Sequence, residues 1–285
     1  MPSFPYTVLD VFTDTPLEGN QLAVVEDADG LDDATMLSFA RETKLSETTF
    51  VQRPTAAGAD YRNRIWTVAR ELPFAGHPSL GTAVVVARRR GLATGRLTQE
   101  TPAGRQPCDV RLEGERLAYA SMLQEPAAFG EEVDPARALG ALGLPAGASA
   151  PSLPPQAVST GVPQILVPVC EPQSLSAVSP DGAAVSALLD EFGAVTLYLA
   201  HVDLDRGTAR ARSFSHLVEG GEDPATGSAA GPLGAYVAER TGVSALDVAQ
   251  GVEMGRPSRL FVEMDGDRVR VGGHAVVIVE GTLSL

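Results

Sequence analysis

The chain has 285 residues, of which 44% are hydrophobic and 20% are charged, so it is long and apolar enough to fold around one or two ordinary cores. Its 22 basic and 36 acidic residues give a net charge of −14, which disfavours nucleic acid or an anionic membrane as a partner. A small anionic metabolite is not disfavoured, because a few local N–H donors can outweigh a distant net charge.

The sequence shows no sign of a targeting signal or of a membrane-spanning segment. The N-terminal segment lacks the charged and apolar regions of a signal peptide, and no stretch approaches the roughly 20 apolar residues of a membrane span. We therefore expect a cytoplasmic protein.

Cys108 and Cys170 form no Cys-x-x-Cys pair, so neither a zinc site nor a disulfide is expected. Both are predicted to be small buried apolar residues.

The first half of the chain reads as short strands with two helices. Alternating residues at 6–12 and 22–25, separated by the turn-forming Gly19-Asn20, predict an opening hairpin. A helix capped by Asp32-Asp33 follows, and an Ala/Val-rich helix ends at Arg90 before Gly91. Further strands are predicted at residues 47–51, 61–68, 97–101, 108–112 and 116–121.

The second half has a similar composition of elements. A Pro-, Gly- and Ala-rich stretch between residues 124 and 163, with one short helix at 134–142, predicts the crossing between halves. Strands are predicted at residues 164–169, 195–199, 210–214, 259–264, 269–271 and 275–283, the last two joined by Gly272-Gly273, and a helix at 180–192. Short strands wrapped round one apolar helix in each half predict an α+β fold rather than a doubly wound parallel sheet.

One short pattern occurs in both halves. Residues 77–83 read His-Pro-Ser-Leu-Gly-Thr-Ala, residues 223–229 read Asp-Pro-Ala-Thr-Gly-Ser-Ala, and an Arg-x-aromatic strand precedes each copy at Arg64 and Arg212. A proline in a first helical turn loses no hydrogen bond, and small residues let backbone N–H groups approach an anion. The duplication predicts two similar halves whose helix N-termini converge on a carboxylate across a pseudo-twofold axis. Two ordinary helix caps are the alternative.

Three titratable residues are candidates for catalysis. Glu47 lies between a helix end and an apolar strand, where burial would raise its pKa towards that of a general acid/base. An exposed glutamate on an edge strand is the alternative. His77 and Asp223 occupy the same place in the two copies and would flank a substrate together with Glu47. Asp223 and its neighbour Glu222 would otherwise be helix-capping acids.

Ser228 is interpreted as an anion-binding hydroxyl. It lies in Thr226-Gly227-Ser228-Ala229, which lacks the Gly-x-Ser-x-Gly elbow of a serine nucleophile but offers N–H donors beside the hydroxyl. The sequence contains neither a Walker motif nor a Gly-x-Gly-x-x-Gly fingerprint, so a nucleotide cofactor is not expected.

Four segments together resemble the PhzF family, which contains the phenazine-biosynthesis isomerase and its relatives. They are Asp10-Val11-Phe12-Thr13 with Gly19-Asn20, residues 45–50, residues 70–78 and residues 222–229, and the match runs from about Tyr6 to the C-terminus. The resemblance implies a diaminopimelate-epimerase-like fold: two similar domains, each a β-barrel-like sheet wrapped round a central helix, with the active site between them. We place these domains at residues 1–123 and 124–285, with a final strand near 275–285 packing onto the first.

The resemblance also implies a cofactor-independent isomerase, commonly a homodimer. Glu47 takes the place of the family's proton-shuttling acid/base, and the other matching active-site positions are His77, Asp223, Gly227 and Ser228, with Asn20 and Gly76 as substrate-binding positions. Neither cysteine lies at a helix start, so a two-thiol racemase is not expected. The chain departs from the family pattern at Gln21 and Val68, where relatives commonly carry proline.

The function predicted from these residues is an isomerase that moves a proton within a small carboxylate-bearing substrate, cyclic or amino-acid-like. Glu47 is the general acid/base, and no metal or other cofactor, nucleic acid or membrane takes part. A ligand-binding or regulatory protein that retains the fold without catalysis is the alternative, since fold does not imply function. A hydrolase or lyase using Ser228 is a third possibility with little support in the sequence.

Overall fold

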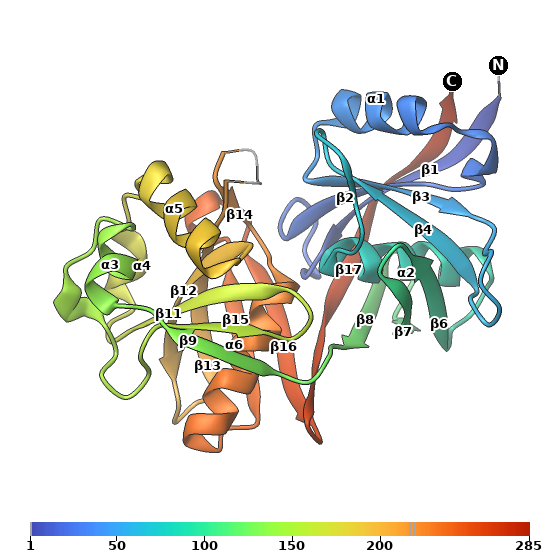
Figure 1. The fold of residues 1–285 in the computed structure, drawn as a ribbon. Helices are drawn as coiled ribbons and strands as arrows, with labels where there is room; N and C mark the ends of the chain where they lie inside the picture. Colours follow the sequence, from blue (N-terminus) through green and yellow to red (C-terminus); the bar gives the residue numbers. More distant parts are fainter. Residues whose placement is uncertain (1, 217, 219) are drawn as a thin grey trace. The chain divides into compact units, whose positions relative to one another are not determined.

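The computed structural model describes residues 2–216, 218 and 220–285, and it divides the chain into two compact units (Figure 1). The first unit combines the residues up to Met122 with Gly272–Leu285, and the second comprises Leu123–Val271. In the described part of the chain, no helix combines the length and the apolar character that crossing a membrane requires.

The first unit is a closed barrel around one helix. Its strands, each paired with the next and the last with the first, are β1 (Ser3–Val11), β2 (Asn20–Val25), β3 (Glu47–Gln52), β4 (Tyr61–Trp66), β6 (Thr94–Thr101), β7 (Gly104–Leu112), β8 (Leu117–Leu123) and β17 (Arg268–Ser284). The enclosed helix is α2 (Gly76–Arg89), whose residues from His77 to Ala87 are all buried. Small and β-branched residues along this helix allow the strands to approach it from all sides.

A second helix covers the outside of the first unit. Helix α1 (Asp33–Thr43) begins at Asp32, whose side chain accepts a hydrogen bond from the Thr35 N–H at 2.8 Å, as the sequence predicts for a capping residue. Its buried residues Met36 and Ala40 pack into a cluster that contains Phe50 and Trp66. Strands β3 and β4 are therefore held between α1 on one side and α2 on the other.

The second unit repeats the strand pattern of the first. Its strands are β9 (Ala128–Glu132), β10 (Gln156–Ser159), β11 (Pro163–Val169), β12 (Thr196–Asp203), β13 (Thr208–Phe214), β15 (Ala245–Gln250) and β16 (Ser258–Asp265). From β10 to β16 the pairings run antiparallel, parallel, antiparallel, parallel, antiparallel, as they do from β1 to β7. Helix α6 (Gly227–Thr241) takes the place of α2 and is buried from Ala229 to Val237. The predicted α+β fold of two similar units is confirmed.

Smaller elements complete the described structure. In the second unit α3 (Pro135–Gly140), α4 (Gln173–Ser176) and α5 (Gly182–Phe192) share an apolar cluster with β11 and β12. Two short strands, β5 (Glu71–Leu72) and β14 (Glu222–Asp223), precede the central helices. Three single 3₁₀ turns lie at η1 (Ala28–Gly30), η2 (Ala146–Ala148) and η3 (Val252–Met254).

The structure corrects the prediction for the end of the chain. The sequence predicts two strands separated by Gly272-Gly273, but β17 is one continuous strand that pairs with β1 along Ser3–Val11 (Figure 1). A Cβ at Gly272 would lie 2.5 Å from the Tyr119 hydroxyl oxygen and 2.7 Å from the Ser121 Cβ. Close packing against β8 therefore explains this glycine, and no turn is involved.

The register of the internal repeat also differs from the prediction. Trp66 pairs with Glu71 in β4–β5, and Phe214 pairs with Glu222 in β13–β14, so Glu71 corresponds to Glu222. The two copies then both read Glu-x-Pro-x-x-Gly, ending at the first residues of α2 and α6. His77 thus corresponds to Ser228 rather than to Asp223. The sequence pattern aligns Pro78 with Pro224, but Pro78 lies in the first turn of α2 and Pro224 lies before the start of α6. Proline is tolerated at both places, so the match between the two prolines does not fix the register.

Candidate active site

Three of the predicted residues meet inside the first unit. Asn20 begins β2, Glu47 begins β3, and His77 lies in the first turn of α2. The Nε2 atom of His77 lies 3.2 Å from Oε2 of Glu47, and its Nδ1 atom lies 3.2 Å from Nδ2 of Asn20. The parallel pairing of β2 with β3, which places Glu47 beside Leu22, brings these strand starts together at the helix N-terminus.

This group is largely shielded from water. Asn20 is fully buried, and only 7% of the His77 side chain and 15% of the Glu47 side chain are exposed. Glu47 is therefore not an exposed edge residue, which settles the alternative that the sequence left open. Ser46 donates a hydrogen bond to Oδ1 of Asn20 at 3.4 Å and helps to orient the amide.

The imidazole of His77 is neutral at physiological pH. Burial lowers the pKa of His77 to about 3, against the opposing effect of a hydrogen bond with the backbone of Gln21. The contact between His77 and Glu47 is therefore not an ion pair. Nδ1 faces the Asn20 amide, and Nε2 faces the Glu47 carboxylate.

The contact between the two residues is poorly aligned for a hydrogen bond, although the atoms are only 3.2 Å apart. Such geometry is common among catalytic groups before substrate binds, and it tightens in the complex. Gly76, the first residue of α2, is half-buried beside them, and the N-cap residue Ala75 offers no side-chain hydrogen bond to the helix.

The other predicted residues cluster in the second unit. Asp223 ends β14, Thr226 is the N-cap of α6, and Gly227 and Ser228 form its first turn. The Thr226 hydroxyl donates to Oδ2 of Asp223 and makes no capping bond to the helix. The first-turn N–H groups and the half-buried Ser228 hydroxyl thus form a short stretch of donors of the kind that binds anions.

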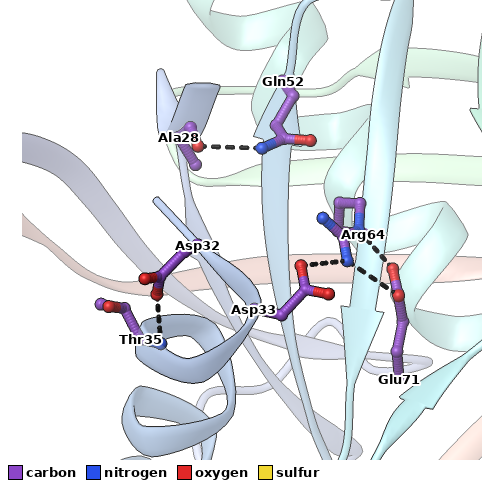
Figure 2. A network of polar contacts seen from close by, with 7 residues as sticks. All are labelled: Ala28, Asp32, Asp33, Thr35, Gln52, Arg64 and Glu71. Carbon is purple, nitrogen blue, oxygen red and sulfur yellow. Dashed lines mark hydrogen bonds and ion pairs between the residues drawn. The ribbon is translucent and has the colours of Figure 1, made fainter. Parts of the chain in front are cut away.

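Two arginine–glutamate pairs near these loops were missed by the sequence analysis. Figure 2 shows Arg64 bonded in a fork to both carboxylate oxygens of Glu71 and, at 2.9 Å, to Oδ1 of Asp33. In the second unit Arg212 binds both oxygens of Glu222 at 2.7 Å. The correct repeat register, which aligns Glu71 with Glu222, is the signal that would have identified them. Each pair ties a barrel strand to the segment that leads into a central helix.

Glu222 is accordingly part of an ion pair, with only 16% of its side chain exposed, and the N-cap position of α6 belongs to Thr226. Arg212 also donates to the Leu175 carbonyl at 2.6 Å and lies over the Phe214 ring, 5.1 Å from its centroid. Arg64 lies over Trp66 in the same way, at 5.6 Å. These contacts hold each arginine from several sides.

The two cysteines differ in their surroundings, and only Cys108 is placed near a central helix, with its thiol 3.9 Å from the Ser79 carbonyl oxygen of α2. Cys108 is buried, and burial raises the pKa of its thiol to about 12. Cys170 is exposed, so the prediction that both cysteines are buried is wrong for this residue. It follows β11 at the surface, where strand periodicity no longer applies. Among the described residues, no group of three or more His, Cys, Asp or Glu side chains is arranged to hold a metal ion.

The two similar units, each with a central helix, define the two-unit epimerase-like fold, and comparisons with known proteins identify a family of isomerases. The family model described as "Phenazine biosynthesis-like protein" (PhzC-PhzF) matches residues 9–281, and the chain belongs to this family. The trans-2,3-dihydro-3-hydroxyanthranilate isomerase of Pseudomonas aeruginosa is 36% identical over 287 residues, which cover 97% of this chain and 98% of the relative. An uncharacterized isomerase of Mesorhizobium japonicum is also 36% identical, with 98% of each chain covered.

Solved structures agree with this assignment. A predicted epimerase from Pseudomonas aeruginosa matches with a TM-score of 0.85 and 35% identity over 98% of this chain and 99% of its own. A PhzF-family protein from Bacillus anthracis matches over the whole of both chains, with a TM-score of 0.86 and 28% identity. A hydroxyproline epimerase from Agrobacterium vitis, with a TM-score of 0.65 and 12% identity over 99% of this chain and 91% of its own, shares the fold alone.

Proposed function

We propose that this isomerase transfers a proton between two carbons of a small, carboxylate-bearing substrate, cyclic or amino-acid-like, with Glu47 as the general acid/base. The observation that carries the proposal is the shielded contact of Glu47 with His77. A carboxylate placed against a neutral imidazole, with little access to water, can exchange a proton with a bound carbon acid without competition from solvent.

The proton transfer needs no other reactant. Glu47 removes a proton from one substrate carbon, the electron pair delocalises into the unsaturated substrate, and Glu47 returns the proton to a different carbon. Substrate and product then have the same atoms and the same charge. His77 does not take the proton, because its pKa of about 3 keeps it neutral, and it orients the carboxylate instead. The proposal therefore calls for no metal and no other cofactor.

The start of α6 is proposed to bind the substrate carboxylate through the N–H groups of Gly227 and Ser228 and the Ser228 hydroxyl. Fixed N–H dipoles beside a carboxylate stabilise the negative charge that develops on the neighbouring carbon during deprotonation. Asp223 would act on the same substrate as a second acid/base or as an acceptor for a polar substituent. Asn20 and Gly76 are proposed to contact the substrate beside Glu47. A cytoplasmic homodimer remains a prediction from the sequence.

The relative from Pseudomonas aeruginosa suggests the first substrate to test, trans-2,3-dihydro-3-hydroxyanthranilate. The compound is incubated in deuterated water with wild type, Glu47→Gln and Glu42→Gln, and followed by NMR. Glu42 is an exposed residue of α1, so its variant controls for the loss of one carboxylate. Wild type and Glu42→Gln should isomerise the compound, whereas Glu47→Gln should be about 10²- to 10⁴-fold slower, the usual contribution of a general acid/base.

Each outcome has a definite meaning. Near-normal turnover by Glu47→Gln in a folded protein would refute the role of Glu47. If the compound raises the melting temperature of wild type but no variant exchanges any proton, the chain binds ligands of this class without the proposed catalysis. Circular dichroism of the three proteins establishes that each is folded.

A further inference from the structure

A buried glutamine lies directly beneath the turn that carries Asp223. Gln250 is the last residue of β15 and is fully buried. Its Nε2 atom donates to the Asp223 carbonyl at 2.7 Å and to the Thr226 hydroxyl at 3.0 Å. Both donors of the side-chain amide are therefore used on one turn of four residues.

The oxygen of the same amide is also fully used. Its Oε1 atom accepts the Thr226 N–H at 3.1 Å and the Tyr198 hydroxyl at 2.9 Å. Rotating the amide by half a turn would place its NH₂ against two donors and its oxygen against a carbonyl. The amide thus has one stable orientation, and Tyr198 fixes it from the side of β12.

The Thr226 hydroxyl links this amide to the Asp223 carboxylate. A hydroxyl has one proton, and since Thr226 Oγ1 accepts a bond from Gln250, its proton is free to point at Oδ2 of Asp223, to which it donates. The result is a directed chain of hydrogen bonds from Tyr198 through Gln250 and Thr226 to Asp223. Such chains polarise one another and hold the terminal acceptor in one position.

A buried glutamine on a barrel strand also contacts the central helix of the first unit, although it is not the register equivalent of Gln250. Gln99 in β6 donates to the Ser79 hydroxyl at 2.7 Å, and that hydroxyl donates to the Ala75 carbonyl at the start of α2. A glutamine therefore ties a barrel strand to the central helix in both units. The chain from Gln250 differs in ending on an ionisable side chain, which a purely structural tie does not require.

We propose that Gln250 is a positioning residue that, through Thr226, orients the Asp223 carboxylate for the substrate. This inference rests on the proposed function, in which Asp223 acts on the substrate. The hydrogen bond from Thr226 stabilises the ionised carboxylate, so its loss should make Asp223 easier to protonate. Asp223 is also close enough to act on Tyr198 electrostatically, since its charge adds to the dominant effect of burial in raising the pKa of Tyr198.

The test is an NMR titration of the Asp223 carboxyl carbon in wild type and four variants. Thr226→Val should raise the Asp223 pKa by about one unit, the size expected for one lost hydrogen bond to the ionised form. Gln250→Leu, which removes the support of the Thr226 hydroxyl, should shift the Asp223 pKa in the same direction. Thr226→Ser keeps the hydroxyl and should titrate as wild type. Gln164→Leu is the matched control, because Gln164 is an equally buried glutamine of the same unit, hydrogen-bonded to Thr196 and Val162.

Kinetics on the substrate complete the test. Gln250→Leu and Thr226→Val should lower kcat/KM at least tenfold and shift its acid limb upward, while Thr226→Ser and Gln164→Leu keep the wild-type profile. An unchanged Asp223 pKa in Thr226→Val would overturn the inference, and this variant decides alone if Gln250→Leu does not fold. The titration uses no substrate, so it stands even if the proposed isomerisation is refuted by the Glu47 variant.

Discussion

The Nε2 atom of His77 and the Oε2 atom of Glu47 lie 3.2 Å apart, although 30 residues and two strands separate them in the chain. This contact joins the first turn of α2 to the first residue of β3. It pairs a neutral ring with a carboxylate, because burial keeps the histidine from gaining a proton. Both the stability of the first unit and the proposed chemistry depend on that neutrality.

Stability should fall in acid because of His77. Its pKa is about 3 in the folded chain and about 6.5 in an unfolded one, so between these values the unfolded state binds more protons. The contribution is fully present above pH 6.5 and is lost as the pH falls towards 3, with a slope of up to about 1.4 kcal/mol per pH unit. Urea unfolding of wild type and His77→Gln from pH 4 to 7 measures it, and the variant should show the flatter curve. His216→Gln, which removes an exposed histidine, is the control. Equal slopes for wild type and His77→Gln would contradict this assignment.

Replacing Arg64 with lysine should weaken the fork seen in Figure 2. The guanidinium binds both oxygens of Glu71 and also Asp33, and a lysine ammonium cannot reproduce this planar geometry. We expect a loss of about 1 to 3 kcal/mol in the free energy of unfolding and a lower kcat/KM. Arg62→Lys, on the same strand, should change neither quantity appreciably. Full activity together with full stability in Arg64→Lys would show that the fork is dispensable.

Gly19→Ala should disturb the segment that carries Asn20. Gly19 has φ +68°, and a Cβ there would lie 2.5 Å from the Val11 carbonyl oxygen, which is backbone and cannot move aside easily. The left-handed conformation and the clash together should cost about 1 to 3 kcal/mol, measured by chemical unfolding. Gly30→Ala is the matched control, because its Cβ would meet no atom within 4 Å. A Gly19→Ala variant as stable as the control would show that this turn rearranges freely.

The two cysteines should differ sharply in reactivity. Cys108 is buried with a pKa of about 12, whereas Cys170 is exposed. An aromatic disulfide reagent at pH 8 should therefore label one thiol per chain in the native protein and two after unfolding. Cys170→Ser should abolish native labelling, and Cys108→Ser should leave it unchanged. Rapid native labelling in Cys170→Ser would mean that the barrel around β7 opens readily.

Much of the fold could be predicted because apolar periodicity marks it. Strand β2 buries five of its six residues, and the central helices are rich in small apolar residues. Strand β9 was missed because all five of its residues are exposed and leave no alternation. Strand β15 was missed because its inward positions end on a polar residue, Gln250, which is buried only through its hydrogen bonds.

The contacts within the candidate site could not be predicted from the sequence. Glu47, His77 and Asn20 were each recognised locally, yet their meeting depends on the parallel pairing of β2 with β3, which no local pattern encodes. The partner of Arg64 was missed for a related reason. Glu71 and Glu222 become equivalent only when strand pairing sets the register of the repeat, and the two prolines favoured a different one.

The pairing of strand β17 affects the order in which the two units can fold. Strand β17 closes the barrel of the first unit by pairing Ser284 with Ser3, so that unit is assembled from the two ends of the chain. During synthesis on the ribosome the intervening unit is complete before the barrel that encloses His77 can close. A chain truncated before Gly272 would lack the strand that pairs with both β1 and β8, so the barrel that contains Glu47 and His77 would stay open.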